Sequence, residues 1–139
     1  MWVGLILAAG VLLSEPRVVD GDTLRDGRGE YYRVENLDAP ELGRRARCPA
    51  ELALAEAARD EARRLVATAS RVEAIETGRR DRYDRNLARI EIDGRDLGET
   101  LIAQGLARPW RGRSSNFCET TTASRSTTPQ RPARSMAAR

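Results

Sequence analysis

The 139-residue chain has no histidine, no lysine and only two cysteines. The absence of histidine removes the Ser-His-Asp triad, the histidine general base and nearly all catalytic zinc sites. Proton transfer therefore falls to carboxylates, tyrosine, arginine or metal-bound water. Cys48 and Cys118 lie far apart and form no Cys-x-x-Cys motif, which disfavours a zinc ribbon or a thioredoxin-type redox site. A single disulfide or two inert thiols remain.

The absence of lysine makes all 24 basic residues arginine, a bias of the whole chain. Arginine suits phosphate oxygens, yet its presence at any one position is weak evidence where lysine is never used. The 21 acidic residues leave a formal net charge of +3, which suggests an anionic partner without the charge excess of a nucleic-acid coat protein. The positions of the arginines therefore matter more than their number.

Long apolar runs are also scarce. Residues 2–13 are apolar but too few for a membrane-spanning helix, which needs roughly 20 residues. Their length matches the apolar region of a secretory signal, although no basic residue precedes them and Ala8-Ala9-Gly10 is only a fair cleavage site. Two readings stay open: residues 1–15 are a signal peptide or amino-terminal anchor, or they begin with the first core strand of a cytoplasmic protein.

The length fits one domain and leaves no room for a second catalytic domain. Short apolar runs separated by Asp-Gly turns predict a β-meander from residue 17, and the strand over residues 32–37 stops at Pro40. Pro49 then opens a predicted helix that runs to about residue 67. One apolar stripe of this helix comprises Leu54, Ala58, Ala62, Leu65 and Val66.

Two further strands are predicted over residues 72–76 and 87–92, around a basic loop at 78–86. Asp96, followed by Glu99, predicts the cap of a second helix that ends at Gly105. Residues 112–139 are rich in Ser, Thr, Arg and Pro, so we expect a mostly disordered tail. The fold class predicted for residues 16–111 is α+β: a five-stranded OB-type barrel with two helices.

The first of three polar clusters is Asp20-Gly21-Asp22-Thr23. Residues two apart in a strand face the same side, so Asp20 and Asp22 present two carboxylates to one point if Gly21 stays extended. Two like charges so close repel unless a cation joins them. The alternative is that Asp-Gly is merely a hairpin turn.

The second cluster is Asp38-Ala39-Pro40-Glu41. It adds two carboxylates and the Ala39 carbonyl, which proline holds in an extended segment. Carboxylates, carbonyls and water are the ligands of Ca²⁺ or Mg²⁺. The alternative is a proline-terminated strand with solvated acids. Arg33 and Asp38 are an odd number of residues apart, so they share a face only if the strand bends, bulges or ends between them.

The third cluster places Tyr83 among the arginines of residues 79–85. A solvated basic loop would have the same composition, but the interleaved tyrosine favours contact with phosphates or bases. Together the three clusters supply oxygens for a hard cation, a spare carboxylate for water and two arginines for a phosphate. This combination is typical of phosphodiester cleavage.

In this order, the segments VVDGDTL, YRVENLDAPE and RRDRYDRNLARIEIDGRDLGETLIAQGLA resemble the staphylococcal nuclease (thermonuclease) family over residues 17–110. The resemblance implies an OB-fold and Ca²⁺-dependent hydrolysis of DNA and RNA that leaves 3′-phosphates, with Mg²⁺ as the less favoured ion. It also implies residue roles. Asp22, Asp38 and the Ala39 carbonyl match metal ligands, Asp20 acts through water, Glu41 matches the general base or water-orienting residue, Arg33 and Arg85 match phosphate-binding arginines, and Arg82 and Tyr83 line the nucleotide site.

Several positions depart from the family pattern. Ala39 replaces a threonine, which matters little if only the carbonyl binds metal. Asp84 stands where glycine is usual, and an added carboxylate there could weaken substrate binding. Trp110 lies near the aromatic residues that contact the base, so it either stacks on a base or fills the core. The long final helix is missing, a loss that a Cys48–Cys118 disulfide in an oxidising compartment could offset.

We therefore expect an exported, monomeric, Ca²⁺-dependent nuclease that acts on DNA and RNA and needs no stable protein partner. The competing hypothesis is a non-catalytic member of the same fold that binds nucleic acid or protein. A structural Ca²⁺-binding module is a distant third.

Overall fold

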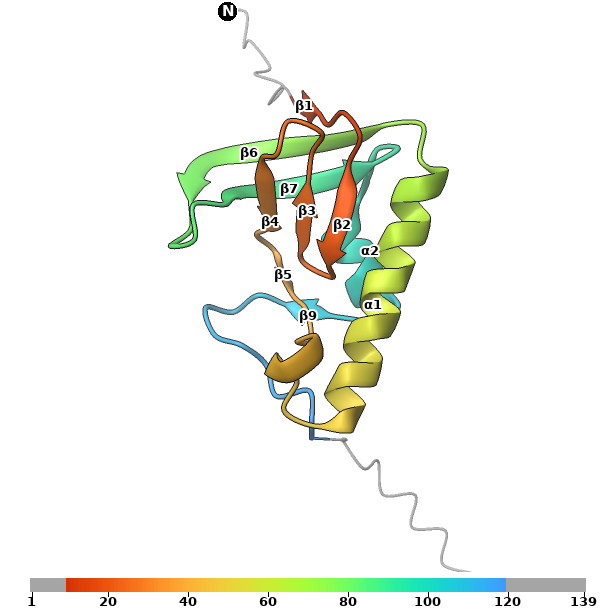
Figure 1. Ribbon diagram of the computed structural model, residues 1–139, viewed down its shortest axis with the longest axis vertical. Coiled ribbons are helices and arrows are strands. Elements are labelled where there is room, and N and C mark those ends of the chain that lie inside the picture. The colour runs from red at the N-terminus through yellow and green to blue at the C-terminus, as the bar shows by residue number, and fades with distance from the viewer. Residues whose placement is uncertain (1–9, 120–139) are drawn as a thin grey trace, which may run out of the picture.

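A curled antiparallel sheet flanked by two helices forms the body of the protein (Figure 1). The computed structural model describes residues 10–119. Five strands make up most of the sheet: β2 (Arg17–Asp20), β3 (Thr23–Arg25), β4 (Tyr31–Val34), β6 (Val72–Arg80) and β7 (Asn86–Ile92). The predicted α+β class, with a curled sheet and two helices, is confirmed.

Two short strands extend this sheet. They are β1 (Val11–Leu12), which pairs with β6, and β8 (Arg95–Asp96), which pairs with β7. The strand order is β1-β6-β7-β4-β3-β2, and only the β4–β7 pair is parallel. That parallel pair joins the meander β2–β4 to the long β6–β7 hairpin, so the sheet curls around its apolar face.

Helix α1 (Pro49–Thr68) begins at the predicted proline and lies along one side of the sheet, against β2 (Figure 1). Its buried stripe is built from small side chains, Ala55, Ala58 and Ala62, which let the helix approach the sheet closely. Helix α2 (Leu97–Ala103) has Asp96 as its N-cap, and the Asp96 side chain accepts a hydrogen bond of 2.8 Å from the Glu99 amide. The predicted cap is therefore present.

A break after β4 corrects the predicted strand over residues 32–37. The strand ends at Val34, a turn follows, and β5 (Leu37–Asp38) pairs with β9 (Arg108–Pro109) in a separate two-stranded sheet. The break removes the alternation that would have put Arg33 and Asp38 on opposite faces. The predicted basic loop is also shorter than expected, because β6 continues to Arg80 and leaves only a tight turn before β7.

The last residues of the amino-terminal apolar stretch are part of the folded domain. Strand β1 pairs with β6, and Leu13 is buried in the core. Residues 1–9, on which the expected signal peptide or anchor mainly rests, lie outside the described residues. Within residues 10–119, no helix combines the length and the apolar character that crossing a membrane requires.

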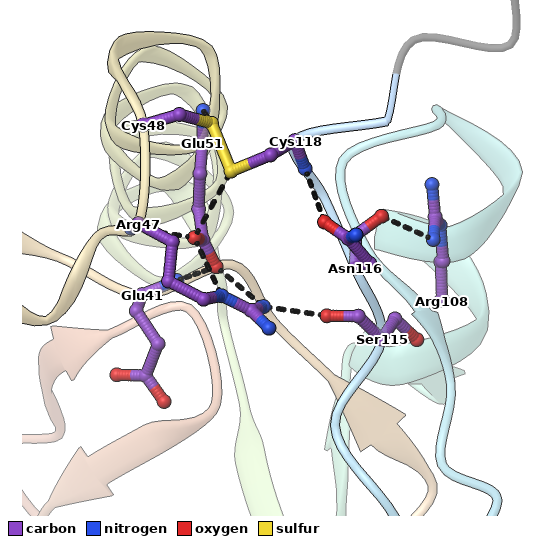
Figure 2. Close-up of a disulfide and its surroundings, with 8 residues drawn as sticks. All are labelled: Glu41, Arg47, Cys48, Glu51, Arg108, Ser115, Asn116 and Cys118. Carbon is purple, nitrogen blue, oxygen red and sulfur yellow. Dashed lines mark hydrogen bonds and ion pairs between the residues drawn. A yellow bond between two sulfur atoms is a disulfide. The ribbon is translucent and has the colours of Figure 1, made fainter.

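Residues 112–118 pack against the domain, which corrects the expectation that the disordered tail begins at 112. The Phe117 side chain is buried, and Cys118 forms a disulfide with Cys48 at the start of α1 (Figure 2). Residues 120–139 of the expected tail lie outside the described residues. The disulfide ties this segment to a helix 70 residues earlier in the chain.

We expect Cys48→Ser and Cys118→Ser, singly or together, to lower the free energy of unfolding by about 4 kcal/mol, because the crosslink limits the entropy of the unfolded chain. Urea denaturation measures this change. A serine at position 48 keeps a cap for the helix, so the loss reports the crosslink and not the cap. Equal stability of variant and wild-type proteins would contradict the prediction.

Candidate active site

The ten residues predicted to bind metal, water, phosphate or base all line one cleft of about 310 Å³. They come from five stretches of the chain: Asp20, Asp22, Arg33, Asp38, Ala39, Glu41, Arg82, Tyr83, Arg85 and Trp110. Four further residues complete the wall: Pro40, Leu42, Arg45 and Ser114. The cleft lies where the β2–β3 turn, the segment after β5, the β6–β7 turn and the segment after β9 meet.

The first acidic cluster forms the turn between β2 and β3. The Asp22 amide donates to Asp20 Oδ1 at 3.2 Å, so the hairpin-turn reading is correct for the backbone. Both carboxylates nevertheless line the cleft. Gly21 permits the close packing of this turn, because a Cβ at that position would lie 3.1 Å from the Ala39 Cβ.

Asp22 is the most perturbed acid in the cleft. Burial and the neighbouring Asp20 carboxylate together raise its pKa to about 6, and Arg33 opposes the shift. The Arg33 guanidinium lies 3.3 Å from Asp22 Oδ2, and the Thr23 hydroxyl donates to Asp22 Oδ1 at 2.9 Å. One guanidinium is thus insufficient to offset the burial of Asp22 and the neighbouring Asp20 charge.

Asp38 is held by the carboxyl-terminal segment. Its side chain is buried, and the Ser115 amide donates to Asp38 Oδ2 at 2.5 Å. The neighbouring Ala39 is also buried. This hydrogen bond fixes the orientation of the group, and among residues 10–119 no donor bonds the other carboxylate oxygen, Oδ1.

Arg33 is placed by strand pairing. It lies opposite Thr23 in the β3–β4 register, which brings its side chain to the adjacent Asp22. The Arg33 guanidinium also donates to the Leu37 carbonyl at 2.9 Å, across the break after β4. On its other side it lies 5.8 Å from the centre of the Trp110 ring.

Arg85 is fixed by the turn between β6 and β7. Asp81 accepts hydrogen bonds from the Tyr83 and Arg85 amides and from Arg85 Nε, the last at 2.7 Å. Burial raises the pKa of Asp81, but these hydrogen bonds outweigh it and hold the pKa below its usual value. A further bond of 2.9 Å runs from Arg85 to the Thr23 hydroxyl. Both arginines therefore approach the same acidic turn.

Asp84 does not crowd the cleft. It has a φ of 61°, as expected for a residue in a glycine position, and its side chain pairs with Arg80 at 3.3 Å. It is absent from the lining of the cleft. The extra carboxylate therefore points away from the two arginines at the site.

Tyr83 and Trp110 expose aromatic surface beside the cleft. Trp110 is 43% exposed and Tyr83 is 63% exposed, so Trp110 does not fill the core. Both also line a second, more open hollow of about 530 Å³, which adjoins the first and includes Leu87. The Arg82 and Arg85 guanidiniums lie 4.8 Å and 5.4 Å from the centre of the Tyr83 ring.

A model of the "Staphylococcal nuclease homologue" family matches residues 32–135. The chain belongs to this family. Among curated relatives, endonuclease YncB of Bacillus subtilis (strain 168) is 33% identical over 96 residues, which is 66% of this chain and 44% of the relative. The SPbeta prophage-derived endonuclease YokF of the same organism is 34% identical over 96 residues, which is 66% of this chain and 32% of the relative. The chain thus spans less than half the length of these relatives.

Three residues of this nuclease homologue contact the segment that carries Glu41, although the sequence patterns did not single them out. They are Arg45, Arg47 and Glu51. Glu51, in the first turn of α1, is fully buried and accepts hydrogen bonds from Arg47 and from the Glu41 amide. The Arg47 side chain, despite the burial of the carboxylate, holds the pKa of Glu51 below its usual value. Arg45 lies 3.7 Å from the Glu41 carboxylate. In the sequence, Glu51 is an acidic residue in the first turn of a predicted helix. Such residues are common there because they interact favourably with the helix dipole, so the position gave no sign of a special role.

Two groups of side chains are candidates for binding a metal ion. Cys48, Glu51 and Cys118 bring three potential ligand atoms together, but the two sulfurs are bonded to each other and are not thiolates. The carboxylates of Asp20, Asp22 and Asp38 and the Ala39 carbonyl are a hard oxygen set instead. Their oxygen chemistry fits a divalent cation, as does the pKa of Asp22, which burial and the neighbouring Asp20 raise.

We expect Asp22→Asn to stabilise the protein in EDTA. The pKa of about 6, against 3.8 for an unperturbed carboxyl, means that ionised Asp22 opposes folding above pH 6 and that this effect disappears below pH 4. The gain should reach about 1–2 kcal/mol at pH 8, less than the shift alone implies because Arg33 loses its partner. Thermal melts at pH 8 and pH 4 measure it.

Asp60→Asn is the matched control, since Asp60 is exposed on α1. It should give no comparable gain at pH 8. A less stable Asp22→Asn protein at pH 8, or a gain that persists at pH 4, would contradict the prediction.

Proposed function

We propose that this chain is a Ca²⁺-dependent endonuclease that hydrolyses phosphodiester bonds of DNA and RNA and leaves 3′-phosphates. The observation that carries the proposal is the convergence of carboxylates, two arginines and two aromatic rings, from distant segments, on one cleft. The names of the relatives, both endonucleases, support it.

Asp22, Asp38 and the Ala39 carbonyl would hold the cation, with Asp20 beside them. A bound Ca²⁺ would supply positive charge for the phosphate oxygens. The protein contributes orientation: the Ser115 amide fixes the Asp38 carboxylate, and Thr23 fixes that of Asp22. Because these donors are in place before substrate arrives, the site needs little reorganisation.

Arg33 and Arg85 would bind the phosphate on which charge accumulates during hydrolysis. Both guanidiniums are fixed by protein oxygens, Arg33 by Asp22 and the Leu37 carbonyl, and Arg85 by Asp81 and Thr23. Fixed donors stabilise developing charge better than mobile ones. The salt bridges also hold the two side chains at the rim of the cleft.

Glu41 would orient and deprotonate the attacking water. Its side chain is 44% exposed, so water reaches it, whereas its backbone amide is anchored to Glu51 at 3.3 Å. Figure 2 shows the Glu41 carboxylate directed away from the disulfide and from Glu51. The carboxylate, which pairs with the exposed Arg45 at 3.7 Å, is therefore accessible to water while its backbone is fixed.

Tyr83 and Trp110 would stack against bases next to the cleaved bond. Stacking on aromatic rings tolerates every base, which agrees with action on both DNA and RNA. The disulfide supports function in an oxidising compartment, outside the cytoplasm.

The central test is cleavage of single-stranded DNA and RNA by the purified chain, with Ca²⁺ and with excess EDTA. Glu41→Gln and Arg85→Ala should each lower kcat by roughly 100- to 1000-fold, through loss of the base or of a phosphate donor. Arg95→Ala is the matched control, because Arg95 is exposed at the opposite end of β7 from Arg85. It should retain wild-type activity.

Activity that persists in EDTA would overturn the metal requirement. Binding of nucleic acid without cleavage, unaffected by Asp22→Ala, would favour the non-catalytic alternative. Products with 5′-phosphates would overturn the proposed position of bond cleavage.

We also expect Trp110→Ala to raise KM for single-stranded substrate by about 10-fold with little change in kcat, because a stacking contact to a base is lost while the groups that would act on the phosphate and the water stay in place. Steady-state kinetics on a short oligonucleotide measures both constants. Tyr31→Ala, which removes another exposed aromatic residue away from the cleft, is the control. A fall in kcat with unchanged KM would contradict the stacking role.

A further inference from the structure

Glu51 is a buried carboxylate that the proposed chemistry does not use. Its Oε2 accepts hydrogen bonds from the Arg47 amide at 2.8 Å and from Arg47 Nε at 3.1 Å, and its Oε1 accepts from the second Arg47 nitrogen at 3.1 Å. Oε1 also accepts from the Glu41 amide at 3.3 Å. An ionised group so deep in the protein requires this full set of donors. Glu51 thereby fixes both ends of the loop that carries Glu41.

The same network reaches Asp38 from the other side. Arg47 donates to the Ser115 carbonyl at 2.6 Å, and the Ser115 amide donates to Asp38 Oδ2 at 2.5 Å. A continuous path of hydrogen bonds therefore joins Asp38, Ser115, Arg47, Glu51 and the Glu41 amide. Two residues with proposed roles in the chemistry lie at its two ends, and the proposed chemistry gives Arg47 and Glu51, which lie between them, no role.

The disulfide links covalently the two chain segments that this network joins. Cys48 directly follows Arg47, and Cys118 lies three residues after Ser115. Figure 2 shows the bond directly beside the Glu51 carboxylate, and Cys118 Sγ lies 3.8 Å from Glu51 Oε2. Within residues 112–118 the other anchors to the domain are few, chiefly the buried Phe117 ring and the bond from Arg108 to the Asn116 carbonyl. Without the crosslink, no covalent bond would hold the segment that bears Ser115 to α1, and its described anchors would be these contacts and the two hydrogen bonds of Ser115 itself.

We propose that Glu51 is a positioning residue for Glu41 and Asp38, and that the Cys48–Cys118 disulfide keeps this arrangement assembled, so that the nuclease reaches full activity only when oxidised. The inference rests on the proposed function, because it assigns a control to that same cleft. A dithiol that reduces the disulfide transfers two electrons and two protons to it. Two cysteine thiols and an oxidised dithiol result, and the segment is released from α1.

The alternative is that residues 112–118 block the cleft. The geometry favours support instead, because the cleft keeps about 310 Å³ with the segment in place and only Ser114 of that segment lines it. The Ser115 amide neutralises no charge on Asp38, so the carboxylate remains available to a cation. Reduction should then lower activity, whereas release of a blocking segment would raise it.

The test compares Glu51→Gln, with its disulfide intact, with the wild-type protein in the oxidised state and in dithiothreitol. Glutamine preserves shape but removes the charge that orients Arg47. We expect kcat with Ca²⁺ to fall roughly 10- to 100-fold in Glu51→Gln and in reduced protein, with KM nearly unchanged. Glu61→Gln is the matched control, since Glu61 also pairs with an arginine on α1 but lies outside the cleft. It should leave kcat unchanged.

A second readout needs neither metal nor substrate. Amide hydrogen exchange at Ser115 and Glu41, followed by NMR, should accelerate at least about 10-fold on reduction and in Glu51→Gln, while the core of β7 stays protected. Circular dichroism confirms that each sample remains folded. If reduction unfolds the whole protein, the positioning role is tested by the oxidised Glu51→Gln variant alone.

Unchanged kcat and unchanged exchange in folded Glu51→Gln would overturn the positioning role. Higher activity after reduction would show a blocking segment and overturn the proposed control. If oxidised wild-type protein cleaves no nucleic acid, the proposed function fails, and exchange at the two amides still tests the positioning network by itself.

Discussion

Carboxylates that are removed from water need donors, and this constraint shapes the active-site end of the protein. Asp22, Asp38 and Glu51 are each largely or wholly buried, and each takes its donors from another segment. Asp22 faces Arg33 from β4, Asp38 faces the Ser115 amide near the end of the described chain, and Glu51 faces the loop before α1. An unpaired buried charge is strongly unfavourable. Satisfying three of them therefore brings four segments together around one cleft.

The acidic residues of the cleft also lower the stability of the folded protein, and packing elsewhere in the fold offsets this loss. Burial and the nearby Asp20 carboxylate raise the pKa of Asp22 to about 6, a conflict that a cation would relieve. The apolar core and the close packing of α1 through its alanines stabilise the domain that carries these acids. The disulfide adds a covalent link between α1 and the segment after β9. Function and stability thus meet at the same residues.

Local patterns predicted the regular elements well. Pro49 marks the start of α1 and Asp96 caps α2, because proline and aspartate act on the backbone next to them. The break after Val34 could not be foreseen, because it depends on β9 pairing with β5 from 70 residues further along the chain. The sequence analysis also missed that residues 112–118 pack on the domain, for a related reason. Their composition is polar, and the bonds that fix them involve Asp38, Arg47 and Cys48.

By itself, the sequence determined which chemical groups are available: a chain without histidine, with carboxylates in two acidic clusters, arginines that could bind phosphate, and Tyr83 and Trp110, whose exposure it left undecided. It also indicated the family to which they belong. Only the tertiary structure decided that ten of these groups share one cleft and that Asp84 points away from it. The structure alone revealed Glu51 and Arg47 as the link between Glu41 and Asp38. The reason is physical: residue type fixes chemistry locally, whereas burial and hydrogen-bond partners arise only when distant segments pack together.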